Sequence, residues 1–171
     1  EIDTGIHVLM ALQQSAKLSD NRAIRFAVLV HDLGKGITPK HILPSHSGHE
    51  ARGVTLVDSL CDRLKVPNPF RQLALAVTEY HLMCHKALGL EPELILALLK
   101  GIGALKSSDK LEDFILCCEA DARGRTGFEE RDYPSADYLR AALAEVTDIS
   151  ITDLVVSGTD GAEIGRQVVL R

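Results

Sequence analysis

The apolar residues of this chain recur at helical spacing almost throughout. They follow one another at three- and four-residue intervals in segments near 6–12, 21–33, 49–64, 68–81, 91–99 and 110–122. Residues spaced in this way lie on one face of an α-helix, whereas a half-buried strand alternates apolar and polar side chains. Such alternation is nearly absent, and aromatic residues make up 4% of the chain with no Trp. We therefore predict an all-α, multi-helix bundle.

Local signals predict where several helices begin and end. Asn21 is the expected N-cap of the second helix, and Asn68-Pro69 is expected to open the fourth with a capping side chain and an early proline. Gly34 and Gly36 are expected to stop the second helix. Residues 37–48 contain two prolines and a glycine, which indicate a loop.

In the last part of the chain, the sequence pattern predicts three further helices, at 135–146, after Ser150, and from Gly161 to the C-terminus. No internal repeat or low-complexity linker interrupts the pattern, so we expect residues 1–171 to form one domain. The chain opens without an initiator Met, directly on a patterned segment. We therefore expect it to be a piece of a longer protein.

Composition excludes several classes of function. No apolar run approaches the roughly 18 residues of a membrane helix. No basic segment followed by an apolar one opens the chain, so we expect no secretory signal. The formal net charge of −5 argues against a global basic surface for nucleic acid, but it allows a local basic pocket for one phosphate. The four cysteines form no CxxC pair, which favours a reduced, cytoplasmic setting, with Cys117 and Cys118 as small apolar fillers of a helix.

The distribution of His and Asp predicts a site assembled between helices. The candidate metal ligands are His7, His31, Asp32, His49, His81 and Asp121. Apart from the adjacent pair His31-Asp32, the intervals between them, counted from His31, run from 18 residues (His31 to His49) to 40 residues (His81 to Asp121), which excludes a local zinc-finger clip. Bundle cores build metal sites from side chains of different helices. A set of imidazoles and carboxylates without thiolates suits a first-row divalent ion with open positions for water and substrate.

Charged neighbours extend the candidate site. Lys35 follows the His31-Asp32 pair closely enough to meet a substrate phosphate or a leaving oxygen, so Asp32 and Lys35 are the candidate catalytic residues. The guanidinium groups of Arg123 and Arg125, just after Asp121, could hold phosphate bidentately. Together with Lys35, they are the candidate phosphate-binding residues. Two more groups are candidates for supporting the ligands, Glu50 beside His49 and Asp3 four residues before His7.

Several charged residues and histidines can also be interpreted as having only a structural role. Arg123 and Arg125 could instead close a helix end or pair with Glu129 and Glu130, and Lys35 could be a solvated turn residue. The remaining histidines are interpreted as surface or capping residues: His41, His46 and His85. His46 is the least secure of these three, because it lies three residues from His49.

Several of these motifs resemble a known family. His7, the run His31-Asp32-Leu33-Gly34-Lys35, the run Gly48-His49-Glu50, and Asp121 resemble the HD superfamily of metal-dependent phosphohydrolases. Residues 1–7, 119–127 and 132–134 are similar, more narrowly, to the C-terminal HD domain of bacterial multifunctional CCA proteins, the tRNA nucleotidyltransferases. The resemblance runs across nearly the whole chain. Nothing in it resembles the nucleotidyltransferase head, which would lie upstream.

The resemblance implies a helical HD domain that hydrolyses 2′,3′-cyclic nucleotides, 2′-nucleotides and phosphate monoesters. It implies one or two divalent ions (Ni, Mn, Co or Mg), held by His31 and Asp32, by His7 and Asp121, and by His49 and His81 if two ions bind. Its implied partners are a nucleotide or the phosphate of a tRNA 3′-end, tRNA through the parent enzyme, and a possible second copy in a homodimer. Two alternatives remain: a non-catalytic module that positions tRNA or dimerises the parent enzyme, and an HD hydrolase of another nucleotide.

Overall fold

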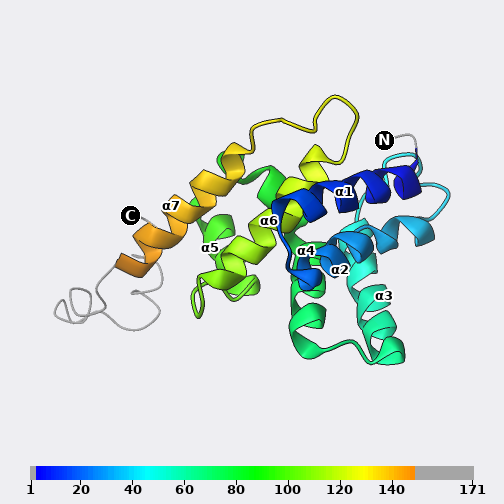
Figure 1. The fold of residues 1–171 in the computed structure, drawn as a ribbon, viewed down its shortest axis with the longest axis horizontal. Coiled ribbons are helices and arrows are strands. Elements are labelled where there is room, and N and C mark those ends of the chain that lie inside the picture. Colours follow the sequence, from blue (N-terminus) through cyan, green and yellow to red (C-terminus); the bar gives the residue numbers. More distant parts are fainter. Residues whose placement is uncertain (1–2, 149–171) are drawn as a thin grey trace.

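The structure, a computed structural model, describes residues 3–148 of the chain, and these form an all-α bundle (Figure 1). No strand occurs between residues 3 and 148, which confirms the predicted fold class. The seven α-helices of this part are α1 (Thr4–Leu18), α2 (Arg22–Val30), α3 (His49–Leu64), α4 (Asn68–His85), α5 (Pro92–Gly101), α6 (Asp109–Arg123) and α7 (Pro134–Asp148). Two short 3-10 helices, η1 (Leu33–Ile37) and η2 (Ala87–Gly89), complete it. The helices expected after Ser150 and from Gly161 lie outside the described residues.

Side-chain caps explain where the first two helices begin. The Asp3 carboxylate accepts a hydrogen bond from the Ile6 amide at 2.9 Å, which caps α1. The Asn21 side chain accepts one from the Ala23 amide at 3.0 Å, so the predicted cap of α2 is confirmed. Both bonds satisfy amides that have no partner within the helix.

Two predicted boundaries are wrong in detail. Helix α2 ends at Val30, before the glycines that were expected to stop it, and the chain passes into η1. The cap of α4 is Pro67, which makes no side-chain cap bond, while Asn68 is already the first helical residue. The loop at 37–48 and the bounds of α3 agree with the sequence pattern.

Helix α2 is the centre of the bundle. It packs against α1, α4 and α6, while α3 packs against α4 and carries η1 on its surface. The largest fully buried side chains include Ile24 of α2 and Phe114 of α6. Helix α7 lies against α5, α6 and η2, on the opposite side of the molecule from α3 (Figure 1). The four cysteines are free and buried, which agrees with the prediction that Cys117 and Cys118 are apolar fillers.

Two glycines allow the elements of the bundle to approach closely. A Cβ at Gly34 of η1 would overlap the carbonyl oxygen of His49, so no other residue fits where η1 crosses α3. A Cβ at Gly124 would come within 2.7 Å of the Ala11 backbone of α1. Both crossings lie beside candidate ligands. Within residues 3–148, no helix combines the length and the apolar character that a membrane span requires.

Candidate metal centre

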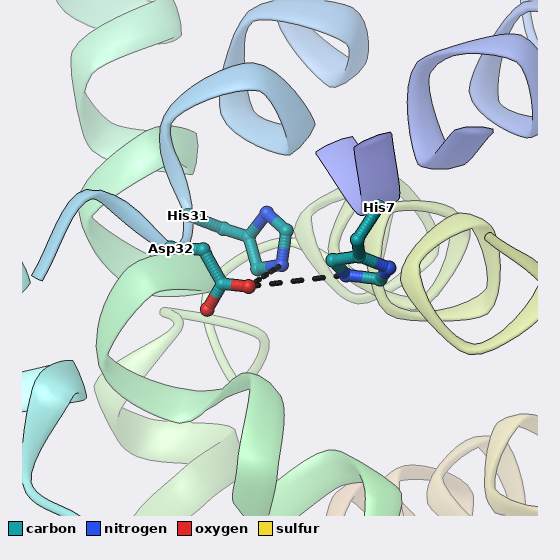
Figure 2. Close-up of side chains that lie close together, drawn as sticks. All are labelled: His7, His31 and Asp32. Carbon is teal, nitrogen blue, oxygen red and sulfur yellow. Dashed lines mark ion pairs between the residues drawn. The ribbon is translucent and has the colours of Figure 1, made fainter. Parts of the chain in front are cut away.

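The bundle brings all six candidate ligands into one buried cluster. They come from five places in the fold: His7 from α1, His31 and Asp32 from the end of α2, His49 from the start of α3, His81 from α4 and Asp121 from α6. Each residue is at most 5% exposed. Burying so many ionisable groups is costly unless they pair with one another or bind a metal. Figure 2 shows His7 reaching from α1 toward the pair at the end of α2.

The end of α2 explains how two adjacent residues face the same centre. His31 is the C-cap of α2 and keeps helical dihedral angles, whereas Asp32 leaves the helix with φ −100° and ψ 9°. Neighbours on an ideal helix project about 100° apart. The change of backbone direction at Asp32 lets both side chains point inward, and the Asp32 Oδ2 atom lies 3.3 Å from His31 Nε2.

Backbone carbonyls orient the four imidazoles of the predicted set. The Nδ1 atoms bond carbonyl oxygens at 2.7–3.1 Å, in the pairs His7 with Gly124, His31 with Val28, His49 with His46, and His81 with Val77. A carbonyl oxygen only accepts, so each Nδ1 carries the proton. In the neutral rings Nε2 is then a lone pair aimed into the cluster, which is the arrangement of metal-binding histidines.

The Asp32 carboxylate lies between two groups of imidazoles. Its Oδ1 atom is 3.1 Å from His49 Nε2 and 3.9 Å from His81 Nε2. Its Oδ2 atom is 3.3 Å from His31 Nε2 and 3.8 Å from His7 Nε2. Because its two oxygens face different groups, this carboxylate has the placement of a bridge between two neighbouring cations.

Asp121 faces the cluster from the opposite wall. Its Oδ1 atom is 2.9 Å from His7 Nε2 and 3.7 Å from His31 Nε2. Its Oδ2 atom is 2.7 Å from Nε2 of His85, whose Nδ1 lies 2.9 Å from the Tyr133 hydroxyl. One Asp121 oxygen therefore faces the centre while His85 and Tyr133 hold the other.

The interpretation of His85 as a surface or capping residue is wrong. Its side chain is 20% exposed, and it belongs to the chain of contacts behind Asp121. The sequence carried a signal for this, because His81 and His85 are four residues apart and share one face of α4. Tyr133 could not be found in the same way, since its partner lies 48 residues away.

The electrostatic interactions within the cluster favour a positive charge at its centre. Burial acts to lower the pKa of His31, but contacts with Asp121 and Asp32 outweigh it and raise that pKa to about 10. Burial acts to raise the pKa values of both carboxyls, yet the surrounding imidazoles hold both well below the ordinary range, and Lys35 also lowers the pKa of Asp32. Burial and the neighbouring His31 charge lower the pKa of His81 to about 3, which leaves that ring neutral.

These side chains fit a divalent metal ion. Three overlapping groups have ligand atoms within 4.8 Å of one another: His7, His31 and Asp32; His31, His81 and Asp121; and Asp32, His49 and His81. His31 Nε2 and Asp121 Oδ1 are buried without a hydrogen bond of normal geometry to any described residue. The Nε2 atoms of His49 and His81 face each other at 3.3 Å, and two lone pairs at that distance require a proton or a cation nearby.

The loop before α3 holds His49 in position. His46 adopts the left-handed conformation, with φ 55°, and its carbonyl oxygen accepts from the His49 ring. Its own ring is bound to the Thr38 hydroxyl at 2.7 Å, and Arg52 donates to the same carbonyl at 3.3 Å. His46 therefore supports a ligand without joining the cluster. His41 is exposed, in agreement with its interpretation as a surface residue.

Two of the predicted cations lie at the edge of the cluster. Lys35 Nζ is 2.7 Å from Asp32 Oδ2, and its side chain is 14% exposed. Arg125 Nη2 is 3.5 Å from Asp121 Oδ1, and its side chain is 43% exposed. Glu50 Oε2 is 3.6 Å from His49 Nδ1, consistent with a supporting role. Lys35 and Arg125 thus flank the carboxylates from different elements, with access to solvent.

Two other predicted residues have different partners. Arg123 is paired outside the cluster: Nη2 pairs with Glu119 Oε1 at 2.9 Å, and Nε donates to the Arg131 carbonyl at 3.0 Å. These partners follow from the i, i+4 spacing on α6 and from the turn that follows it. Asp3 is exposed and caps α1 with its carboxylate, so it orients the helix that carries His7 rather than the ring itself.

A buried cluster of imidazoles and carboxylates in an all-α bundle defines a helical domain with a candidate metal centre. The chain belongs to the HD domain family. The family model described as HD domain matches residues 4–125, which hold all six candidate ligands.

Named relatives extend the match beyond the family model. Over all 171 residues the chain is 54% identical to the Multifunctional CCA protein of Thioalkalivibrio sulfidiphilus (strain HL-EbGR7), of which it covers 42%. It is 50% identical over 166 residues, 97% of its length, to the Multifunctional CCA protein of Teredinibacter turnerae (strain ATCC 39867 / T7901), of which it covers 40%. The chain thus spans about two fifths of the length of these curated relatives. No solved structure matches it.

Proposed function

We propose that this chain is a metal-dependent phosphohydrolase that acts on 2′,3′-cyclic nucleotides, 2′-nucleotides and phosphate monoesters. The observation that carries the proposal is the buried cluster of Nε2 lone pairs and carboxylates with Lys35 and Arg125 at its edge. The relatives are named Multifunctional CCA protein, and the resemblance to the C-terminal HD domain of such tRNA nucleotidyltransferases implies a substrate related to tRNA 3′-ends.

The ligand assignment follows from the distances. One ion would be held by His7, His31, Asp32 and Asp121, whose facing atoms are 2.9–3.8 Å apart. A second would be held by His49 and His81, which lie beside the Oδ1 atom of Asp32, so the Asp32 carboxylate would serve both ions. The donor set accepts Ni, Mn, Co or Mg, and nothing in the geometry of the ligands favours one of these ions.

The chain's own residues would bind and orient the reacting phosphate. A divalent ion in such a site polarises a phosphoryl oxygen and lowers the pKa of bound water. Lys35 and Arg125 can donate to phosphate oxygens and stabilise the charge that develops on the leaving oxygen. Asp32 lies within 2.7 Å of Lys35, so it fixes that ammonium beside the cluster. Glu50 is placed to orient the His49 ring or to accept a proton.

We further propose that the chain works as a single phosphohydrolase domain within a longer protein. The relatives are more than twice its length, and their name points to the CCA sequence. In this setting the substrate would be the phosphate of a tRNA 3′-end, and tRNA would be bound through the rest of that protein. CCA addition would belong to the parts that this chain lacks.

The test is hydrolysis of 2′,3′-cAMP, 2′-AMP and p-nitrophenyl phosphate by the 171-residue chain after chelation and reloading with each metal. We expect hydrolysis that depends on the metal, and a loss of at least about 1000-fold in His31→Ala and Asp32→Ala, which remove the ion's ligands. His41→Ala is the matched control, because His41 is exposed and lies outside the cluster.

Two outcomes would contradict the proposal. A metal-loaded chain that is inert toward all of these phosphoesters, but whose surface variants lose tRNA affinity or change oligomeric state, would identify a non-catalytic module. A chain that ignores 2′,3′-cAMP and 2′-AMP but cleaves a nucleoside triphosphate or a signalling nucleotide would be an HD hydrolase of another substrate.

A further inference from the structure

A groove adjoins the metal-ligand cluster on the side of α1. Leu9 of α1, Leu29 of α2 and Leu33 of η1 line it, together with Asp32 and Lys35. Its volume is about 540 Å³, within the range of pockets that bind small organic ligands. The groove therefore connects the proposed phosphate position to a surface outside the cluster.

The lining of this groove is apolar and exposed. Leu9 is 62% exposed, Leu29 is 48% exposed and Leu33 is 39% exposed. Scattered single leucines on a surface need no explanation, but three from three elements around one groove mark a binding surface. Gly36 is also in the lining, and a Cβ there would meet no atom within 4 Å, so this side of the groove is open.

Two of the three polar side chains that line the groove, Asp32 and Lys35, belong to the proposed reaction, and the third is Thr4. Asp32 is 3% exposed, and Lys35 Nζ lies 2.7 Å from its Oδ2 atom. A ligand that satisfies the whole groove must therefore combine an anionic group, facing Lys35 and the metal ligands, with a flat apolar body that contacts the leucines. A nucleoside phosphate has both parts, whereas inorganic phosphate or a small phosphate ester has only the first.

We propose that this groove is the nucleoside subsite, in which the base and ribose of the substrate contact Leu9, Leu29 and Leu33. The inference rests on the proposed function for the phosphate end, and it assigns the specificity of that site to these three side chains. The bound nucleoside is either that of a free nucleotide or the last one of an RNA strand.

The first test is binding, which does not depend on hydrolysis. Adenosine is titrated into the ¹⁵N-labelled, metal-loaded chain, and amide shifts are followed. We expect shifts confined to the groove, at Gly5, Leu33 and Gly36, and their loss in Leu9→Ser. Leu64→Ser is the matched control, since Leu64 is 59% exposed on α3 and lies outside the groove. Shifts centred elsewhere, or unchanged in Leu9→Ser, would overturn the subsite.

The second test separates recognition from chemistry. In Leu9→Ser and Leu29→Ser we expect kcat/KM for 2′,3′-cAMP to fall about ten-fold, mainly through KM, because apolar contact with the base is lost. Hydrolysis of glycerol 1,2-cyclic phosphate, which has the same cyclic ester without a base, should not change. Equal losses on both substrates would contradict the proposal.

Further outcomes distinguish the two proposals and the source of the nucleoside. Groove-specific adenosine binding by a chain that cleaves neither substrate would overturn the proposed function and support the subsite. Cleavage of both substrates without adenosine binding would do the reverse. An oligonucleotide ending in a 2′,3′-cyclic phosphate that is cleaved faster than 2′,3′-cAMP, with the same loss in Leu9→Ser, assigns the subsite to an RNA end. A lower solution mass for Leu9→Ser than for the wild type would show that the leucines join two copies instead.

Discussion

At the residue scale, the Nδ1 atom of each predicted ligand histidine is hydrogen-bonded to a backbone carbonyl. The bond to the carbonyl fixes the tautomer of each imidazole, because the carbonyl oxygen requires a proton on Nδ1. It also adds no negative charge to a centre that already holds two buried carboxylates. The negative charge that attracts a cation therefore comes from Asp32 and Asp121 alone among the six groups.

This arrangement predicts how metal affinity depends on pH. The carboxylates raise the pKa of His31 to about 10, so below that pH the ring carries a proton that the metal must displace. Affinity should then rise with pH by about ten-fold per unit between pH 7 and pH 9, the slope for release of one proton. Calorimetric titrations in buffers of different ionisation enthalpy measure the proton count. A pH-independent affinity without proton release would contradict this account of His31.

The contacts behind Asp121 predict a role for Tyr133. Its hydroxyl lies 2.9 Å from His85 Nδ1, and His85 holds the Oδ2 atom of Asp121. Tyr133→Phe removes this support, and we expect metal affinity to fall by at least about ten-fold, as for other partners behind metal ligands. Competition with a chelator measures the effect. Tyr138→Phe, an exposed tyrosine on α7, is the control, and equal affinities in the two variants would exclude the role.

At the scale of the elements, the site depends on how closely η1 approaches α3. Gly34 touches the first turn of α3 at His49, where a Cβ would overlap the carbonyl oxygen, whereas a Cβ at Gly36 would meet nothing. We expect Gly34→Ala to destabilise the fold by about 1–3 kcal/mol, as overpacking does. Gly36→Ala should change stability by less than about 1 kcal/mol, in the stabilising direction. Urea denaturation of both variants distinguishes them, and similar midpoints would contradict the packing argument.

The elements also show what the sequence could and could not predict. The bounds of α3 follow from its apolar stripe and the loop before it, so they could be predicted. The start of η1 could not, because a five-residue 3-10 helix has no apolar period. The glycines of η1 were expected to stop a helix, but Gly34 is required by a contact with a residue 15 positions away, which local pattern does not encode.

The site residues likewise divide into those that the sequence could predict and those that it could not. The six ligands could be predicted because their residue types and the resemblance to the HD superfamily point to them. The contacts of His85 with Asp121 and of Tyr133 with His85 depend on how α4, α6 and the segment before α7 meet. Such contacts between distant segments are set by packing rather than by spacing along the chain.

At the scale of the whole molecule, the helices form two groups: those that supply candidate ligands and those that do not. The elements that supply candidate ligands are α2, the helices α1, α4 and α6 that pack against it, and α3 beside α4, while α5 and α7 pack together on another side and supply none within the described residues (Figure 1). The ligands arise from separate elements, so the site exists only when the bundle is folded. Metal binding should therefore be coupled to the stability of the whole bundle.

The most direct test of this account is an anomalous difference map from crystals of the chain grown with Mn²⁺. We expect one peak within bonding distance of His31 Nε2, Asp32 Oδ2 and Asp121 Oδ1, or two peaks that share Asp32, and no such peak in His31→Ala. Crystals of the wild-type chain that bind Mn²⁺ only at exposed groups such as His41, with the cluster empty, would contradict the central claim.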